Sequence, residues 1–144
     1  MLGSQPADLA RTHEEGFVNS FIAPAKRARY LMQLEYPKKR TSALAGLSSG
    51  RDIESSRIIH KWRTTEDRAI LSMLEGYRVP EQAYLIVDGG NNDRTWHLLD
   101  DVITILHHES FGVVASLIAG RIALYKHENP SPVYLLCRHA GLEH

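Results

Sequence analysis

The sequence predicts an α+β fold, in which a helical N-terminal half packs on a mainly antiparallel sheet of four or five strands. In the first half of the chain, apolar residues recur three and four positions apart. Short apolar runs separated by turn residues fill the second half. Because 144 residues match the length of one common domain, we expect a single domain over residues 1–141, with helices covering one face of the sheet.

Three helices are predicted before residue 50. Phe17, Val18 and Phe21 form one apolar patch, which favours a helix over residues 8–21. Pro24 is expected at the first position of the next helix, where its missing N–H does no harm, and that helix should end before Pro37. The third helix is expected over residues 39–47 and should end at the Ser-Ser-Gly sequence that follows.

Two more helices are predicted in the second half. The sequence Thr-Thr-Glu-Asp at residues 64–67 resembles a capping box at the start of a helix that buries Leu74. Gly76 is then expected to be the left-handed residue that ends this helix. A shorter helix is expected to be capped by the acidic pair at residues 100–101 and to end near His108.

The strands are predicted from short apolar runs and from turn chemistry. Residues 83–87 form a branched apolar run, residues 88–93 have turn composition, and residues 95–98 should form the return strand. A three-stranded meander is expected over residues 111–118, 121–126 and 133–138. Gly120 lies between the first two of these strands and can supply the positive φ that a tight hairpin needs.

The charges are sorted along the chain, although they cancel overall. The chain has 17 Lys and Arg and 17 Asp and Glu, but the segment 24–63 contains ten basic residues and three acidic ones. This segment therefore carries seven excess positive charges, and the two flanks carry the compensating negative charge. Such an asymmetry indicates a class of partner, and here it favours a polyanion.

A binding module for RNA or single-stranded DNA is the leading functional expectation. Clustered cations neutralise phosphates, and exposed aromatic rings such as those of Tyr36 and Trp62 stack on unpaired bases. The candidate nucleic-acid-binding residues are Lys26, Arg27, Arg29, Lys38, Lys39, Arg40 and Trp62. Two alternatives stay open: the cations form a solvated helical face, or they contact a protein partner, including a second copy of the chain in a homodimer.

The histidines are the second group of candidates. His97, His107 and His108 flank the acidic pair at residues 100–101, and Asp101 and His108 would share one side of a helix. Their spacing matches neither His-Glu-x-x-His nor a facial triad, so we expect no metal or other cofactor. The sequence also has no Gly-x-Ser-x-Gly elbow and no phosphate loop. A small hydrolase or metal-dependent enzyme is therefore the less favoured interpretation, and no catalytic residue is assigned.

Composition and the two ends of the chain give expectations about membrane contact, cellular compartment and terminal residues. No apolar run approaches the about 18 residues that cross a bilayer, so no membrane contact is expected. Cys137 is the single cysteine, which agrees with a reducing compartment, and a soluble cytoplasmic protein is expected. Residues 142–144 resemble the start of a purification tag, and residues 1–12 are expected to be loose or to form a short helix from Ala7 onward.

Overall fold

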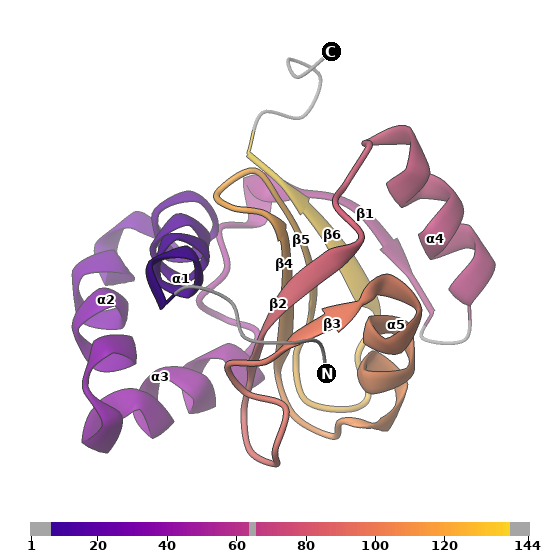
Figure 1. Cartoon of the computed structure of the whole chain (residues 1–144). Helices are drawn as coiled ribbons and strands as arrows, with labels where there is room; N and C mark the ends of the chain where they lie inside the picture. The colour runs from indigo at the N-terminus through magenta and orange to yellow at the C-terminus, as the bar shows by residue number, and fades with distance from the viewer. Residues whose placement is uncertain (1–6, 64–65, 139–144) are drawn as a thin grey trace.

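The computed structural model describes residues 7–63 and 66–138 (Figure 1). Its helices are α1 (Ala7–Phe21), α2 (Arg27–Glu35), α3 (Pro37–Ser49), α4 (Asp67–Gly76) and α5 (Leu99–His108), with short 3₁₀ turns at Pro24–Lys26 and Ser55–Arg57. Its strands are β1 (Ile58–Trp62), β2 (Gln82–Val87), β3 (Trp96–Leu98), β4 (Val113–Ile118), β5 (Ile122–Lys126) and β6 (Val133–Cys137). The chain therefore has the expected α+β architecture.

One antiparallel sheet joins the six strands in the order β1-β6-β5-β4-β2-β3. The predicted meander forms β4, β5 and β6, and the predicted return strand forms β3 against β2. The strand count of four or five was too low because β1 was not predicted. It is an edge strand of five residues in which His60 and Lys61 are exposed, so its apolar pattern is weak.

Helices cover both faces of the sheet, which corrects the expectation of one covered face (Figure 1). Tyr84 and Ile86 of β2 point to α1, α2 and α3, whereas Leu85 and Val87 point to α4 and α5. Side chains alternate between the faces of a strand, so both faces need apolar residues when both are covered. The unbroken apolar run at residues 83–87 follows from this double burial.

Gly120 has a φ of 73° in the turn between β4 and β5, as the hairpin prediction required. The prediction for the end of α4 was wrong: Gly76 is the last helical residue, and Arg78 adopts the left-handed conformation with a φ of 54°. The predicted Thr cap falls on residues 64–65, outside the described residues. Leu98 is the N-cap of α5, and the two aspartates expected to cap it lie in its first turn.

None of the helices in the described parts of the chain is long and apolar enough to cross a membrane.

Candidate functional site

The structure divides the seven residues expected to bind nucleic acid between the two faces of the sheet. Six of them lie on α2, on α3 or in the turn before α2: Lys26, Arg27, Arg29, Lys38, Lys39 and Arg40. Trp62 belongs to the apolar cluster under α4 and α5, on the opposite face. Trp62 is only 5% exposed, so the expectation of an exposed indole was wrong. Burial of this large ring stabilises the edge of the sheet instead.

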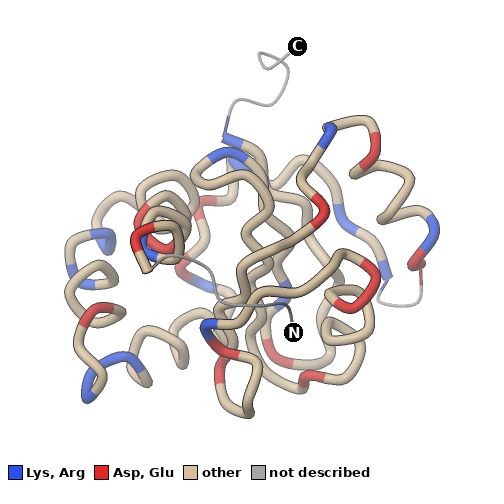
Figure 2. The backbone as a smooth tube through the Cα atoms, in the orientation of Figure 1, with Lys and Arg blue, Asp and Glu red and all other residues tan. Residues whose placement is uncertain are grey.

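The remaining cations differ in whether they are already bonded within the protein or exposed to solvent. Lys26 forms an ion pair with Asp52, and the Nε of Arg27 donates to the carbonyl of Ile22 at 2.8 Å. The residues that stay exposed are Arg29, Lys38 and Lys39. Figure 2 shows Lys and Arg positions on both sides of the sheet, interspersed with Asp and Glu. The positive charge of the described chain is therefore spread over the molecule.

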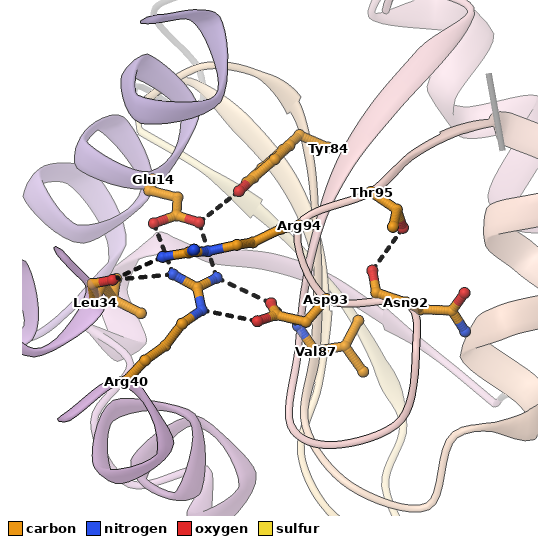
Figure 3. A network of polar contacts seen from close by, with 9 residues as sticks. All are labelled: Glu14, Leu34, Arg40, Tyr84, Val87, Asn92, Asp93, Arg94 and Thr95. Carbon is orange, nitrogen blue, oxygen red and sulfur yellow. Dashed lines mark hydrogen bonds and ion pairs between the residues drawn. The ribbon is translucent and has the colours of Figure 1, made fainter. Parts of the chain in front are cut away.

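Arg40 is the centre of a buried polar network (Figure 3). Its Nη1 and Nη2 donate to the two carboxylate oxygens of Glu14 at 2.9 and 2.8 Å. Its Nε and Nη2 donate to the two oxygens of Asp93 at 2.7 and 2.9 Å, and Nη1 also donates to the carbonyl of Leu34 at 3.2 Å. Arg40 is 6% exposed and its charge is paired with two carboxylates inside the protein, so its phosphate contact stays a prediction.

Tyr84 connects this network to β2, and Arg94 connects it to the β2–β3 loop (Figure 3). The Tyr84 hydroxyl, on β2, donates to Glu14 at 2.5 Å. Arg94 lies in the loop between β2 and β3, and its Nη2 donates to the same Leu34 carbonyl at 3.2 Å. The network, which we call the Arg40 network, therefore joins α1, α2 and α3 to the sheet through Glu14, Leu34, Arg40, Tyr84, Asp93 and Arg94.

The backbone of Arg94 is held in a left-handed conformation with a φ of 64°. Its N–H donates to the carbonyl of Leu85 at 2.9 Å, and the Leu85 N–H donates to the carbonyl of Thr95 at 2.9 Å. Asp93 in addition accepts the N–H of Val87 at 3.0 Å. A non-glycine residue keeps such a conformation only where its surroundings fix it, and these bonds fix the loop that carries the Arg94 side chain.

Burial and charge pairing determine the protonation states in the network. Burial raises the pKa of Tyr84 well above its ordinary value, and the negative charge of Glu14 raises it further. Burial alone would lower the pKa of Arg40, but its bonds to Asp93 and Glu14 outweigh that effect and raise it. Tyr84 is therefore a neutral donor and Arg40 a permanent cation at physiological pH.

A pocket of about 360 Å³ opens beside the Arg40 network, between α1, α2 and the β2–β3 loop. Glu14, Leu34, Tyr84 and Arg94 belong to both the pocket lining and the network. Besides Leu34, the apolar part of the lining comes from the same two helices and consists of Ala7, Ala10, Leu31 and Met32. This volume lies within the range of about 300 to 1,000 Å³ that small-molecule sites have.

The rest of the lining is charged. Arg11 and Glu15 come from α1, and Glu35 comes from the end of α2. Within residues 7–63 and 66–138, the side chains of these three residues form no hydrogen bond or ion pair. The pocket therefore combines an apolar wall with charged groups that have no partner in the described chain.

A second hollow of about 650 Å³ lies between the end of α4 and the turn that joins β4 to β5. Arg78, Arg121 and Cys137 are among its lining residues. It is larger, but the pocket at α1 and α2 is the stronger candidate because four of its lining residues are fixed by the Arg40 network. We call this candidate the α1–α2 pocket.

Comparison with protein-family models, with curated proteins and with solved structures finds no match for this chain. Its function is therefore inferred from the geometry of its own residues.

The histidines and aspartates of residues 97–109 do not converge on one site. The Nε2 of His97 lies 2.8 Å from the Thr95 hydroxyl, whereas the Nδ1 of His108 donates to the carbonyl of Thr104 on its own helix. Asp101 is exposed. In the parts of the chain that the structure describes, no three His, Cys, Asp or Glu residues are placed to hold a metal ion.

The sequence contained a signal for the burial of Arg40, but none for its partners. Arg40 precedes Ala43, Leu44 and Leu47 by three, four and seven positions, so it lies on the buried stripe of α3. A charged side chain on such a stripe needs a buried partner of opposite charge. Which carboxylates supply the pairing depends on how α1 and the β2–β3 loop pack, and no local pattern encodes that.

Proposed function

We propose that this protein is a binding module that takes a small organic ligand in the α1–α2 pocket. One observation carries the proposal: the inner wall of the pocket is bonded into the buried Arg40 network before any ligand arrives. Side chains that are already fixed lose little conformational entropy on binding, so such a wall favours affinity and selectivity.

The apolar wall supports the same proposal. Met32 is 37% exposed although it lines the pocket, and Ala10 and Leu31 next to it are half-buried. A ligand that covers these side chains removes apolar surface from water, which supplies binding free energy at about 25 cal/mol per Å². A concave, mostly apolar surface with a few fixed polar groups is the usual composition of a small-molecule site.

The experiment that tests this proposal uses substitutions whose larger side chains fill the pocket. Wild-type protein and the variant Ala10→Trp are mixed with a set of small aromatic compounds that includes anions, cations and neutral molecules, and binding is followed by ligand-observed NMR. We expect wild type to bind at least one compound and Ala10→Trp to bind none, because the indole occupies the space beside Leu31 and Met32. Ala7→Trp, at a more exposed position of the same lining, is the second filling variant.

The matched control is Ala28→Trp, which adds the same ring at an exposed position of α2 outside the lining. This variant should bind as wild type does. The proposal is wrong if wild type binds no compound, or if both filling variants bind as well as the control.

Binding of RNA or single-stranded DNA is the second candidate function, and the corner between α2 and α3 favours it. Tyr36 is 55% exposed there, and Lys38 and Lys39 beside it are exposed as well. An exposed ring next to ammonium groups can combine base stacking with phosphate contact. Arg29 is the further exposed cation of the expected set, whereas Arg40 and Trp62 are buried.

This second candidate is tested with labelled single-stranded RNA and DNA at about 50 mM salt, a condition that favours electrostatic binding. Affinity should fall by about 0.7 log units per tenfold rise in salt for each phosphate contacted. The double variant Lys38→Glu, Lys39→Glu should reduce that slope, whereas Tyr36→Ala should weaken binding and leave the slope nearly unchanged. Absence of binding at this salt would exclude the candidate, and salt-sensitive self-association would favour the protein-partner alternative.

A further inference from the structure

We infer that the ligand of the α1–α2 pocket is zwitterionic: an amino acid or similar small molecule with a carboxylate, an ammonium group and an apolar side chain. This inference rests on the proposed function and adds the chemical class of the ligand. It follows from which charges of the lining are already paired and which are left for a ligand.

Glu14 is not available to a ligand. One of its carboxylate oxygens accepts from Arg40 Nη1, and the other accepts from Arg40 Nη2 and from the Tyr84 hydroxyl. Its side chain is 13% exposed, and its ion pair with the guanidinium of Arg40 neutralises its charge. Glu14 therefore shapes the inner wall, and the charge offered to a ligand comes from other residues.

Arg94 offers a fixed site for a carboxylate. Its Nη2 is held by the Leu34 carbonyl, while its Nε and Nη1 have no acceptor in the described parts of the chain. The hydrogen bonds of the β2–β3 loop hold the backbone at Arg94, and its side chain extends toward Leu34 (Figure 3), which lines the pocket as Arg94 does. A guanidinium with free N–H groups binds a carboxylate more strongly than a neutral donor does.

Glu15 and Glu35 offer sites for an ammonium group. They come from the two helices that form the pocket, and neither carboxylate has a partner in the described parts of the chain. Arg11 is the fourth charged residue of the lining without a pairing partner. The charges left for a ligand are thus two positive and two negative. A ligand with one charge would leave an excess of the other sign, whereas a zwitterion complements both.

The apolar wall then determines what else the ligand carries. Ala7, Ala10, Leu31 and Met32 present no hydrogen-bonding side chain, so the group that lies against them should be apolar. Small alanines leave space, and the flexible thioether of Met32 can adapt to side chains of different shapes. An amino acid with an aliphatic or aromatic side chain has the required combination of groups.

Three probes that share a phenyl ring and differ in charge separate the contributions of the carboxylate and of the ammonium group to affinity. L-Phenylalanine is zwitterionic, phenylacetate is an anion and phenethylamine is a cation, and their affinities for the full chain are measured by titration calorimetry. We expect phenylalanine to bind at least about tenfold more tightly than either singly charged probe, which is the effect of one charge-assisted hydrogen bond.

Substitutions then assign each end of the ligand. Arg94→Asn removes the guanidinium and keeps a residue that tolerates a left-handed backbone, so it should weaken phenylalanine and phenylacetate but not phenethylamine. The double variant Glu15→Gln, Glu35→Gln should weaken phenylalanine and phenethylamine but not phenylacetate. Arg78→Asn is the matched control, because Arg78 has the same left-handed backbone and lies outside this lining. Arg94→Gly replaces Arg94→Asn if circular dichroism shows that the latter is not folded.

The outcomes distinguish this inference from the proposed function. If a singly charged probe binds as tightly as phenylalanine, or none of the three binds, while Ala10→Trp still abolishes binding of other compounds, the zwitterionic class is wrong and the pocket remains the site. If Ala10→Trp and Ala7→Trp leave binding of every compound unchanged, the proposed function and this inference are both wrong.

Discussion

The carboxylate of Glu14 on α1 and the guanidinium of Arg40 on α3 meet through two hydrogen bonds of 2.9 and 2.8 Å, although 26 residues separate them. Both side chains are nearly buried, and Asp93 pairs with the same guanidinium from the β2–β3 loop. Because the partners come from three different elements, this contact fixes the helical layer against the sheet. The shape of the α1–α2 pocket depends on that arrangement.

Removal of the guanidinium should therefore destabilise the protein strongly. Arg40→Met keeps most of the apolar stem but leaves the carboxylates of Glu14 and Asp93 without their cation. We expect the free energy of unfolding to fall by about 3 to 5 kcal/mol, the usual cost of breaking a buried ion pair on one side. Unfolding in urea measures this value.

The control for this experiment is Lys39→Met, which removes an exposed cation from the preceding position of the same helix. Its effect should stay within about 0.5 kcal/mol, as for other surface substitutions. If Arg40→Met and Lys39→Met changed stability equally, the Arg40 network would not hold the layer together.

Asp52 should make the stability of the protein depend on acidic pH. Its carboxylate accepts hydrogen bonds from Lys26 and from the Tyr30 hydroxyl. Burial acts to raise its pKa, but these two bonds outweigh burial and hold the pKa below the ordinary value of 3.8. A carboxyl group with a lowered folded-state pKa contributes stability above its unfolded pKa and loses that contribution as pH falls through the folded value.

The variant Asp52→Asn should therefore be less stable than wild type at neutral pH. The difference should shrink as the pH falls from about 4 through the lowered folded-state pKa, because the unfolded chain takes up a proton at Asp52 before the folded chain does. Urea unfolding at neutral pH and near pH 3 compares the two proteins. A difference that stays constant over this range would show that the charge of Asp52 contributes nothing.

His13 should produce a second pH dependence, in a higher range. Its Nδ1 lies 2.6 Å from the Ser116 hydroxyl in the core, and burial lowers the pKa of His13 below its ordinary value of 6.5. The unfolded chain therefore takes up a proton at this residue more readily than the folded chain does. Stability should fall as the pH falls from about 6.5 through the folded pKa, and the variant His13→Gln should lack this part of the loss. If wild type and His13→Gln lost the same stability over this pH range, the pH dependence could not be assigned to His13.

Gly120 and Gly76 should respond to substitution in opposite ways. Gly120→Val places a branched side chain at a φ of 73° and should cost about 1 to 2 kcal/mol. Gly76 lies at the end of α4, where a Cβ would point into open space, so Gly76→Ala should stabilise the protein by about 0.5 to 1 kcal/mol. Thermal unfolding of both variants measures the two signs, and a stable Gly120→Val protein would contradict the hairpin strain.

The predictable part of the fold is the part encoded locally. Helical spacing predicted α1, and turn chemistry predicted the hairpin at Gly120, because both depend on neighbouring residues. Strand β1 depends on pairing with β6, more than 70 residues later in the chain, and the exposed His60 and Lys61 interrupt its apolar pattern. The helices on both faces of the sheet had a signal in the unbroken apolar run of β2, because a strand covered on both sides needs apolar residues on both.

The candidate site was hidden from the sequence for a related reason. Charge sorting placed Arg40 and Trp62 in one exposed set, but packing buries them on opposite faces of the sheet. Tyr84 is 70 residues from the Glu14 that it contacts, so the pocket exists only after α1 packs against β2. Net charge along a segment describes solvated residues well and fails for a cation that is paired inside the core.

The most direct test of the α1–α2 pocket is to locate the bound ligand on the protein. Backbone amide signals of isotope-labelled protein are followed by NMR during titration with each of the three phenyl compounds. The pocket predicts that the largest shifts occur at Ala10, Leu31, Met32 and Arg94. Shifts concentrated at residues 76–78 and 118–122 in place of these four would contradict a ligand site between α1 and α2, whereas signals that do not move with any of the three compounds would contradict the zwitterionic class of the ligand.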